Sequence, residues 1–189
     1  MPIHPFSARE TEISGLYVIE MKQIEDERGT VREFYRESDF VAAGLPSLGA
    51  WVQVNLTATG RGAVRGLHGE ATQKFVGVAS GEAFGVYLDP RPESPTYAKV
   101  VTILLAPGTG VLVGRGLCNG FQATAPGITE YLYCFDQEWQ PDMAGVSVSA
   151  LDPDLAIPWP IAIDPSSRHL ISEKDANLPR LCDLGGVTP

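Results

Sequence analysis

Alternating hydrophobic and polar residues in the middle of the chain predict short β-strands. In residues 51–59, Val52 and Val54 alternate with Gln53 and Asn55, so each pair is expected on its own face of one strand. Similar segments recur at a spacing of roughly 8–12 residues, which is typical of β-sandwiches and β-barrels. They cover residues 14–24, 74–80, 81–89, 100–106, 111–114, 119–125 and 128–139.

Glycine and proline separate these segments and argue against a helical bundle. The chain has 20 glycines and 15 prolines among its 189 residues, more than the roughly 12% of an average protein. The pair Ser80-Gly81 suits a hairpin turn between two strands. Residues 26–45 predict a turn, a strand and then a short helix or turn around Asp39.

The pattern changes after Trp139, where aspartate and proline become frequent and alternation is lost. We expect one domain over residues 1–189, with a barrel core at about residues 14–139. Residues 140–189 would form a tail, with a short helix near residues 172–178, packed on the barrel. This tail is too short and too poor in apolar periodicity to bury a core alone.

Charge and composition exclude several classes of protein. The net charge of −9 argues against nucleic-acid binding, which needs a basic face. No apolar run approaches the roughly 18 residues of a membrane span. The N-terminus shows no secretion signal, and the three cysteines, Cys118, Cys134 and Cys182, form no CxxC motif. We therefore expect a cytoplasmic protein without a disulfide framework.

The histidines limit the chemistry that this chain can carry. His4 and His169 lie in segments where surface positions are expected, whereas His68 follows an arginine in the polar stretch VRGLHGE. A metal-binding barrel needs two or three histidines and a carboxylate around the ion, and only Glu70 is near His68. The chain also lacks GxSxG, GxGxxG and Walker motifs. Metal-free acid–base chemistry by one histidine and some tyrosines remains.

The segment EYLYCF places aromatic residues on one face of a strand. Tyr131, Tyr133 and Phe135 alternate with Leu132 and Cys134, so the three rings share a face. In a small barrel one such face points inward. The pattern alone favours an ordinary aromatic core stripe, and Lys74, which opens another strand, is by the same local criterion a solvated strand end.

A set of motifs, taken together, resembles the dTDP-4-dehydrorhamnose 3,5-epimerase family. The resemblance extends over roughly residues 14–184, and it implies an all-β, cupin-like jelly roll that forms a homodimer and uses neither metal nor cofactor. The motifs occur in the order VRGLH (64–68), DPRPESPTY (89–97), NGFQATA (119–125), EYLYCFDQEWQP (130–141), DPDLAIPWP (152–160), SEKD (172–175) and LPRLCDL (178–184).

The resemblance implies four catalytic roles. His68 is the base that removes a proton, and Asp175 is the carboxylate that orients His68. Tyr133 returns a proton from the opposite face of the sugar, and Lys74 faces the developing enolate oxygen. Such a division of roles suits the chemistry, because inversion needs an acid and a base that flank the ring and a cation near the oxyanion.

The resemblance also implies substrate-binding positions. Arg65 and Arg28 match arginines that hold substrate and diphosphate, and Gln53 and Asn55 match polar residues that line the sugar site. Glu33 matches the acidic residue shortly after the DERG motif at residues 26–29. The implied partner is a nucleotide sugar, with dTDP as the nucleotide.

Several positions depart from the family pattern. Gly69 and Glu70 follow the histidine where the family has an aromatic residue and glutamine, and Asn119 stands where the family has a second histidine. Val31 replaces a phenylalanine and Trp139 a tyrosine near the base. Asn119 and Trp139 are still expected to line the substrate site. These changes favour a sibling activity, at one carbon or on a differently substituted sugar.

The leading hypothesis is an epimerase that inverts C3, C5 or both in a nucleotide-linked 4-keto-6-deoxyhexose, in deoxysugar biosynthesis. The C4 ketone acidifies the neighbouring hydrogens, so removal of one gives an enolate at O4. The alternative is a catalytically inactive cupin that binds nucleotide sugars, which the departures at Asn119 and at the pair Gly69-Glu70 motivate. A metal-dependent cupin is disfavoured by the number of histidines.

Overall fold

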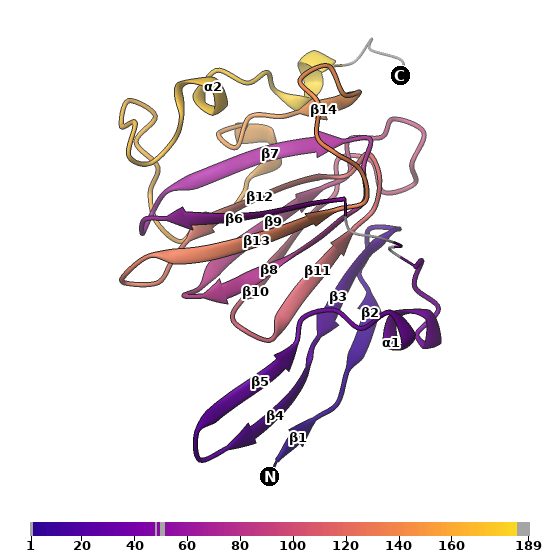
Figure 1. The fold of residues 1–189 in the computed structure, drawn as a ribbon. Coiled ribbons are helices and arrows are strands. Elements are labelled where there is room, and N and C mark those ends of the chain that lie inside the picture. The colour runs from indigo at the N-terminus through magenta and orange to yellow at the C-terminus, as the bar shows by residue number, and fades with distance from the viewer. Residues whose placement is uncertain (1, 48, 50–51, 185–189) are drawn as a thin grey trace.

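Two β-sheets face one another and form the body of the protein in the computed structural model, which describes residues 2–47, 49 and 52–184 (Figure 1). One sheet has the strand order β2 (Ser7–Glu10), β3 (Leu16–Glu20), β11 (Thr109–Val113), β8 (Lys74–Ser80), β13 (Thr129–Phe135) and β6 (Gln53–Thr59). The other has the order β10 (Val100–Leu105), β9 (Ala83–Leu88), β12 (Cys118–Ala123), β7 (Val64–Glu70) and β14 (Gly145–Ser147). The predicted all-β class is confirmed.

The main core lies between the two sheets. Tyr131 of β13 is fully buried there and stacks on Phe121 of β12, with ring centroids 3.9 Å apart. Cys134, on the opposite face of β13, lies in a separate cluster on the outside of the six-stranded sheet. The predicted alternation of faces along residues 131–135 is therefore correct, and the aromatic face points inward.

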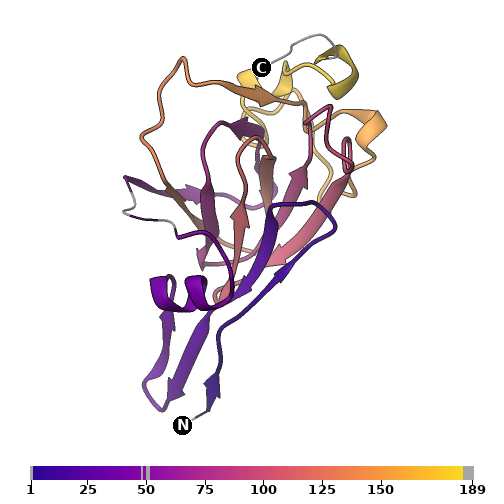
Figure 2. The same cartoon turned by 90° about the vertical axis from the view of Figure 1, so that its right-hand side faces the viewer.

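The N-terminal segment forms a small third sheet that projects from the barrel. Its strands are β1 (Ile3–His4), β4 (Lys22–Asp26) and β5 (Gly29–Glu33), and they extend away from the two large sheets in both views (Figures 1 and 2). The predicted strand over residues 14–24 is two strands, β3 and β4, which meet at the buried residue Met21. The helix expected around Asp39 is α1 (Glu37–Ala42), and its Phe40 packs on the outer cluster.

The segment after residue 139 covers the outer face of the five-stranded sheet (Figure 1). It contains β14, two 3-10 turns at Pro153–Leu155 and Leu181–Leu184, and α2 (Glu173–Ala176), which lies where the sequence predicts a short helix. Trp159 packs against Phe84 of β9, with ring centroids 5.9 Å apart. Residues 185–189 of the predicted tail lie outside the described residues.

Several strands and one strand boundary differ from the sequence prediction. β1, β2 and β14 are not predicted by the pattern, and β13 ends at Phe135 rather than at Trp139. The predicted start of β6, Trp51, lies outside the described residues. In the described chain, no helix is long and apolar enough to cross a membrane.

The most consequential difference is β7, which carries His68. The sequence pattern predicts a glycine-rich link over residues 60–66, with His68 beyond a strand, but Val64–Glu70 is itself a strand. Its buried positions are interrupted by Arg65, His68 and Glu70, so the segment has no regular alternation to signal a strand.

A buried carboxylate organises the proline-rich loop at residues 89–97. Asp89 is fully buried and accepts hydrogen bonds from Arg91 Nε at 2.7 Å and from the hydroxyls of Ser94 and Thr96, both at 2.6 Å. Burial alone would raise the pKa of Asp89, but these hydrogen bonds outweigh it and lower the pKa to about 2. The charged carboxylate therefore stabilises the folded state.

The low pKa of Asp89 predicts a loss of stability in Asp89→Asn. The contribution is complete above the ordinary carboxyl pKa of 3.8 and disappears as the pH falls towards 2, because the folded-state pKa is depressed. We expect the variant to lose about 1–2 kcal/mol of unfolding free energy at pH 7. Urea unfolding followed by circular dichroism measures this difference, which should shrink towards zero near pH 2. The control Glu93→Gln, at an exposed position of the same loop, should match the wild type.

Candidate active site

An irregularity in β7 brings Arg65 and His68 to the same face of the sheet. Arg65 pairs with Phe121 of β12 and His68 pairs with Asn119, so two residues of β7 lie opposite the single residue Gly120. Without this extra residue, side chains three positions apart would point to opposite faces. Both side chains instead enter the space between the two sheets.

Glycine is required at the irregularity. Gly66 has a φ of +122°, and a Cβ atom there would lie 2.6 Å from the Cα atom of Gly120. A side chain at Gly120 would in turn approach the Arg65 carbonyl oxygen to 2.7 Å. The glycine of the RGLH motif therefore allows β7 and β12 to approach closely, while the arginine and histidine supply functional groups.

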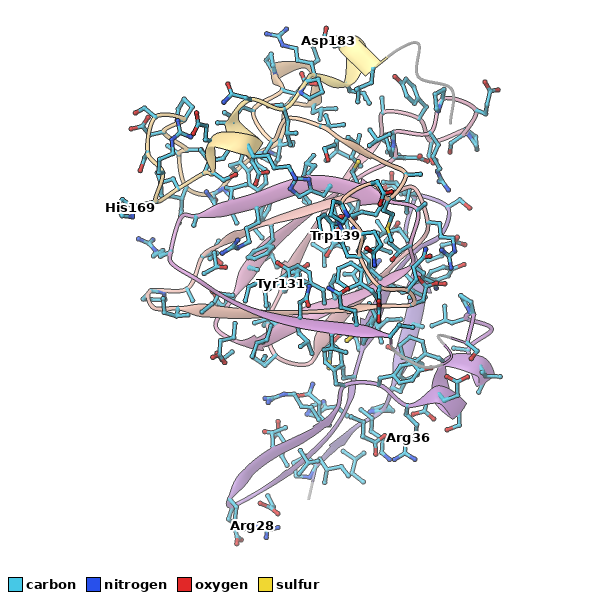
Figure 3. The ribbon with its side chains drawn as sticks, turned by 45° about the horizontal axis from the view of Figure 1, so that its top comes forward. Arg28, Arg36, Tyr131, Trp139, His169 and Asp183 are labelled. Carbon is cyan, nitrogen blue, oxygen red and sulfur yellow. The ribbon has the colours of Figure 1, made fainter. Side chains whose placement is uncertain are left out.

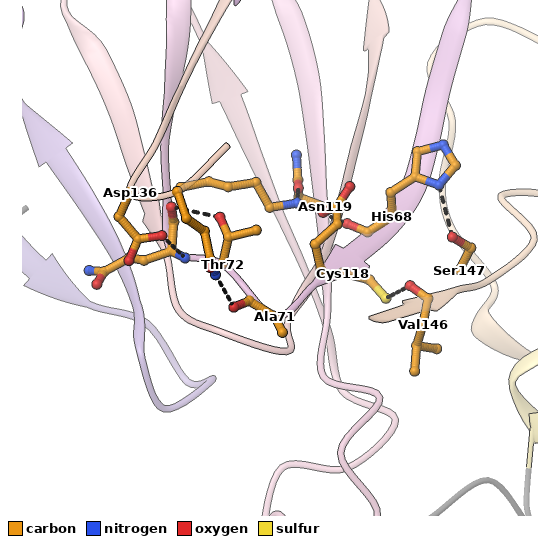
Figure 4. A network of polar contacts seen from close by, with 12 residues as sticks. His68, Ala71, Thr72, Cys118, Asn119, Asp136, Val146 and Ser147 are labelled. Carbon is orange, nitrogen blue, oxygen red and sulfur yellow. Dashed lines mark hydrogen bonds and ion pairs between the residues drawn. The ribbon is translucent and has the colours of Figure 1, made fainter. Parts of the chain in front are cut away.

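His68 is held from both sides of its ring. Its Nε2 lies 3.1 Å from Asp175 Oδ1. Its Nδ1 lies 3.0 Å from Ser147 Oγ, a contact that Figure 4 shows. A serine hydroxyl can donate or accept, so an imidazolium could donate to Asp175 through one nitrogen and to Ser147 through the other. Both hydrogen bonds can therefore persist when the imidazole gains or loses a proton.

Asp175 is a buried carboxylate supplied by the C-terminal segment. It lies in α2, where the Ser172 hydroxyl accepts a hydrogen bond from its amide at 3.0 Å, and its Oδ2 accepts one from the Gly66 amide at 3.4 Å. Burial alone would raise the pKa of Asp175, but the hydrogen bond and charge of His68 outweigh it. The pKa therefore lies below its ordinary value, and the carboxylate stays charged beside the imidazole.

Tyr133 enters the same space from the opposite sheet. Its hydroxyl lies 3.4 Å from Thr57 Oγ1 on the neighbouring strand β6. Burial raises the pKa of Tyr133 above its ordinary value of 10, so the phenol keeps its proton at neutral pH. It is therefore available as a neutral proton donor.

Lys74 is a buried ammonium at the start of β8. Its side chain is 3% exposed, and its Nζ donates to the His68 carbonyl oxygen at 3.1 Å, to Asn119 Oδ1 at 2.6 Å and to Glu70. Figure 4 shows Asn119 beside His68 in this network. The expectation of a solvated strand end, drawn from the local pattern alone, is wrong for Lys74.

His68, Tyr133 and Lys74 line one cavity of about 290 Å³ between the sheets, whereas Asp175 and Ser147 contact His68 without lining the cavity. His68 lies on β7 and Tyr133 on β13, so the imidazole and the phenol reach the cavity from different sheets. Trp139, 44% exposed, lies at its edge and donates its backbone N–H to Gln53 at 2.8 Å. The cavity is lined by Gln53, Asn55, Thr57, Arg65, His68, Glu70, Lys74, Asn119, Gly120, Phe121, Tyr133, Phe135 and Trp139.

Two predicted substrate-binding residues lie outside this cavity. Arg28 is at the tip of the β4–β5 hairpin, far from Trp139 in Figure 3, and forms an ion pair with Asp26. Glu33 lies at the end of β5 and bonds Arg36 and Lys22. Nothing within this one chain brings either residue to His68.

The sequence pattern does not indicate three of the residues that form hydrogen bonds with the predicted catalytic side chains. Thr57 and Ser147 bond the two central side chains, and Glu70, which the sequence marks only as a departure from the family pattern, bonds Lys74. A hydroxyl residue in a strand carries no signal of such a role. In the part of the chain that is described, no cluster of three or more His, Cys, Asp or Glu side chains could hold a metal ion.

The other two histidines are placed as predicted. His4 and His169 are both exposed, and Figure 3 shows His169 away from Trp139, which lies at the edge of the cavity. The cavity therefore combines one imidazole paired with a carboxylate, one protonated phenol and one ammonium. Such a set can remove a proton from a carbon acid, stabilise the resulting oxyanion and return a proton from another direction.

Comparison with known proteins gives a consistent result over nearly the whole chain. A family profile described as dTDP-4-dehydrorhamnose 3,5-epimerase matches residues 10–183. The dTDP-4-dehydrorhamnose 3,5-epimerase of Mycobacterium tuberculosis is 32% identical over 190 residues, which cover 96% of this chain and 92% of that protein.

Solved structures agree with this match. NovW, a 4-keto-6-deoxy sugar epimerase from Streptomyces spheroides, superimposes with a TM-score of 0.87 at 28% identity, over 96% of this chain and 90% of NovW. ChmJ, a 3'-monoepimerase from Streptomyces bikiniensis in complex with dTDP-quinovose, gives a TM-score of 0.83 at 29% identity, over 93% and 88% of the two chains. The predicted cupin-like jelly roll and the enzyme class, an isomerase, are confirmed: the chain belongs to the dTDP-4-dehydrorhamnose 3,5-epimerase family.

Proposed function

We propose that the protein is an epimerase acting on a dTDP-linked 4-keto-6-deoxyhexose, at C3, at C5 or at both, in deoxysugar biosynthesis. The observation that supports this most strongly is the position of His68 and Tyr133, which line one cavity from two different sheets. A base and an acid on different sides of a sugar ring are what inversion of a carbon requires.

His68 takes the proton from the carbon next to the ketone. The electron pair of the broken C–H bond forms a C=C bond, and the carbonyl electrons move to O4, which becomes an enolate oxygen. Lys74 stabilises that charge, and Asp175 stabilises the imidazolium. The electrons of the C=C bond then take the proton of Tyr133 on the opposite face, the C4 ketone re-forms, and the carbon is inverted.

The remaining cavity residues are assigned to binding. Arg65 donates through Nε to Thr59 at 3.1 Å, which leaves its terminal nitrogens for the diphosphate. Gln53 donates to Asn55 at 3.2 Å, and this pair lines the sugar site beside Asn119. Trp139, at the edge of the cavity, would stack on the nucleobase. The dTDP-quinovose bound to ChmJ supports dTDP as the nucleotide.

We also propose a cytoplasmic homodimer. Val52, Val54 and Leu56 form a row of side chains that are each about half exposed, on the outer face of the edge strand β6 and the residue before it. A second copy would cover this row. In such a dimer, the hairpin of one copy would bring its Arg28 and Glu33 to the cavity of the other copy. The three free thiols agree with a reducing compartment.

Deuterium exchange tests the proposed reaction. With dTDP-4-keto-6-deoxyglucose in D₂O, the wild type should incorporate deuterium at C3, C5 or both, as measured by NMR. His68→Asn should lower this exchange by about 100-fold or more, because the base is lost. Tyr133→Phe should retain exchange by proton return to the original face but lose inversion.

His169→Asn is the matched control, since His169 is an exposed histidine of the same chain, and it should exchange as the wild type does. If the wild type binds dTDP by calorimetry but exchanges no hydrogen with this or any other nucleotide-linked 4-keto-6-deoxyhexose, the protein is instead an inactive nucleotide-sugar-binding cupin. Equal exchange in wild type and His68→Asn would exclude His68 as the base.

Sedimentation tests the proposed dimer. The wild type should sediment as two chains at micromolar concentration, and Leu56→Lys should shift it towards one chain because a charge is placed in the apolar row. Leu104→Lys is the control, because Leu104 is also an exposed leucine on an edge strand, but in the other sheet. A monomeric wild type, or a dimer unaffected by Leu56→Lys, would contradict this interface.

A further inference from the structure

All three hydrogens of the Lys74 ammonium are already engaged within the protein. The acceptors are the His68 carbonyl oxygen at 3.1 Å, Asn119 Oδ1 at 2.6 Å and the Glu70 carboxylate. An ammonium has three donors and no more. A substrate oxygen can therefore be bonded by Lys74 only if it replaces one of these partners.

The chain fixes this arrangement through a short connection. Glu70 ends β7 and Lys74 begins β8, so only residues 71–73 separate the two charges. Asp136 holds this link, since it accepts a hydrogen bond from the Gln73 amide at 3.0 Å and forms an ion pair with Arg115. The side chains of Glu70 and Lys74 both line the cavity beside His68.

The three partners differ in their freedom to leave. The His68 carbonyl belongs to the backbone of β7 and cannot turn away. Asn119 is 7% exposed on the central strand β12, whereas the Glu70 side chain is 19% exposed at the end of its strand. Glu70 is therefore the partner that an incoming oxygen can displace with the least rearrangement.

We propose that Glu70 is a positioning residue that sets the electrostatic strength of Lys74 in enolate formation, an inference that rests on the function proposed above. Its carboxylate holds the ammonium in place and, at the same time, offsets the positive charge that the enolate oxygen needs. Beside an ammonium that is only 3% exposed, a carboxylate this close to the oxyanion opposes its formation. The negative charge of Glu70 therefore slows proton removal, whereas a neutral side chain at position 70 would not.

The kinetic test is Glu70→Gln, which keeps the length of the side chain and an acceptor for Lys74 but removes the negative charge. The ketone carries little charge and the enolate carries a full one, so loss of the Glu70 charge should stabilise the transition state more than the bound ketone. We expect kcat for deuterium incorporation at pH 7 to rise by about threefold or more, with KM within about twofold of the wild type.

Glu138→Gln is the matched control. Glu138 is exposed next to Trp139 at the edge of the cavity, so its replacement changes the net charge equally without touching Lys74. It should leave kcat and KM unchanged. If Glu70→Gln exchanges no faster than the wild type, or if Glu138→Gln accelerates exchange equally, the proposed role of Glu70 is overturned.

A spectroscopic test examines the arrangement without any turnover. The chain has four lysines, and Lys22, Lys99 and Lys174 are partly or fully exposed. In ¹⁵N-lysine-labelled protein at pH 7, only a buried ammonium with three acceptors should exchange its protons slowly enough to give a sharp ¹H–¹⁵N signal. That signal should vanish in Lys74→Arg, shift in Glu70→Gln and stay in place in Glu138→Gln.

The two measurements separate this proposal from the proposed function. A wild type that shows the slow Lys74 signal but no deuterium incorporation would contradict the epimerase assignment and leave no oxyanion for Glu70 to oppose, so both proposals would fall on the kinetic result. A wild type that incorporates deuterium but lacks the signal, or whose signal is unmoved in Glu70→Gln, would refute the role of Glu70 alone.

Discussion

The close approach of β7 and β12 at Gly66 and Gly120 is the constraint on which the cavity depends. Two glycines without side chains allow β7 to accommodate one extra residue opposite β12. That residue turns Arg65 and His68 to the same face, and the regular alternation that follows adds Glu70. One strand therefore delivers a guanidinium, an imidazole and a carboxylate to one side of the space between the sheets.

The two-sheet architecture by itself places the proposed base, His68, and the proposed acid, Tyr133, on opposite sides of the cavity. Tyr133 lies on a strand of the other sheet, so its side chain faces the strand that carries His68. Each is tied by a neighbour, Tyr133 by Thr57 and His68 by Ser147 and Asp175. The last two come from the segment after residue 139. This segment thus covers the outer face of one sheet and also completes the surroundings of the imidazole.

Regular alternation made much of the fold predictable, and irregularity hid the rest. β13 follows a period of two, so the burial of Tyr131 and the outward position of Cys134 could be predicted. β7 could not, because the extra residue at Gly66 breaks its alternation. The position of Lys74 depends on contacts with Asn119, 45 residues away, and no local pattern records such a contact. Motif resemblance named His68, its partner Asp175, Tyr133 and Lys74, but it also named Arg28 and Glu33, which lie outside the cavity. The contacts of Ser147 with His68 and of Thr57 with Tyr133 became visible only in three dimensions.

Two of the expected departures from the family pattern, Glu70 and Asn119, are connected to each other through Lys74. The resemblance predicts other side chains at both positions, and both residues accept hydrogen bonds from the same ammonium. Asn119 provides a neutral acceptor for Lys74, and Glu70 provides a charged one. The two residues therefore act together in satisfying the hydrogen bonds of the buried Lys74 ammonium. The effect of a substitution at either position therefore depends on whether the new side chain still offers the Lys74 ammonium a hydrogen-bond acceptor.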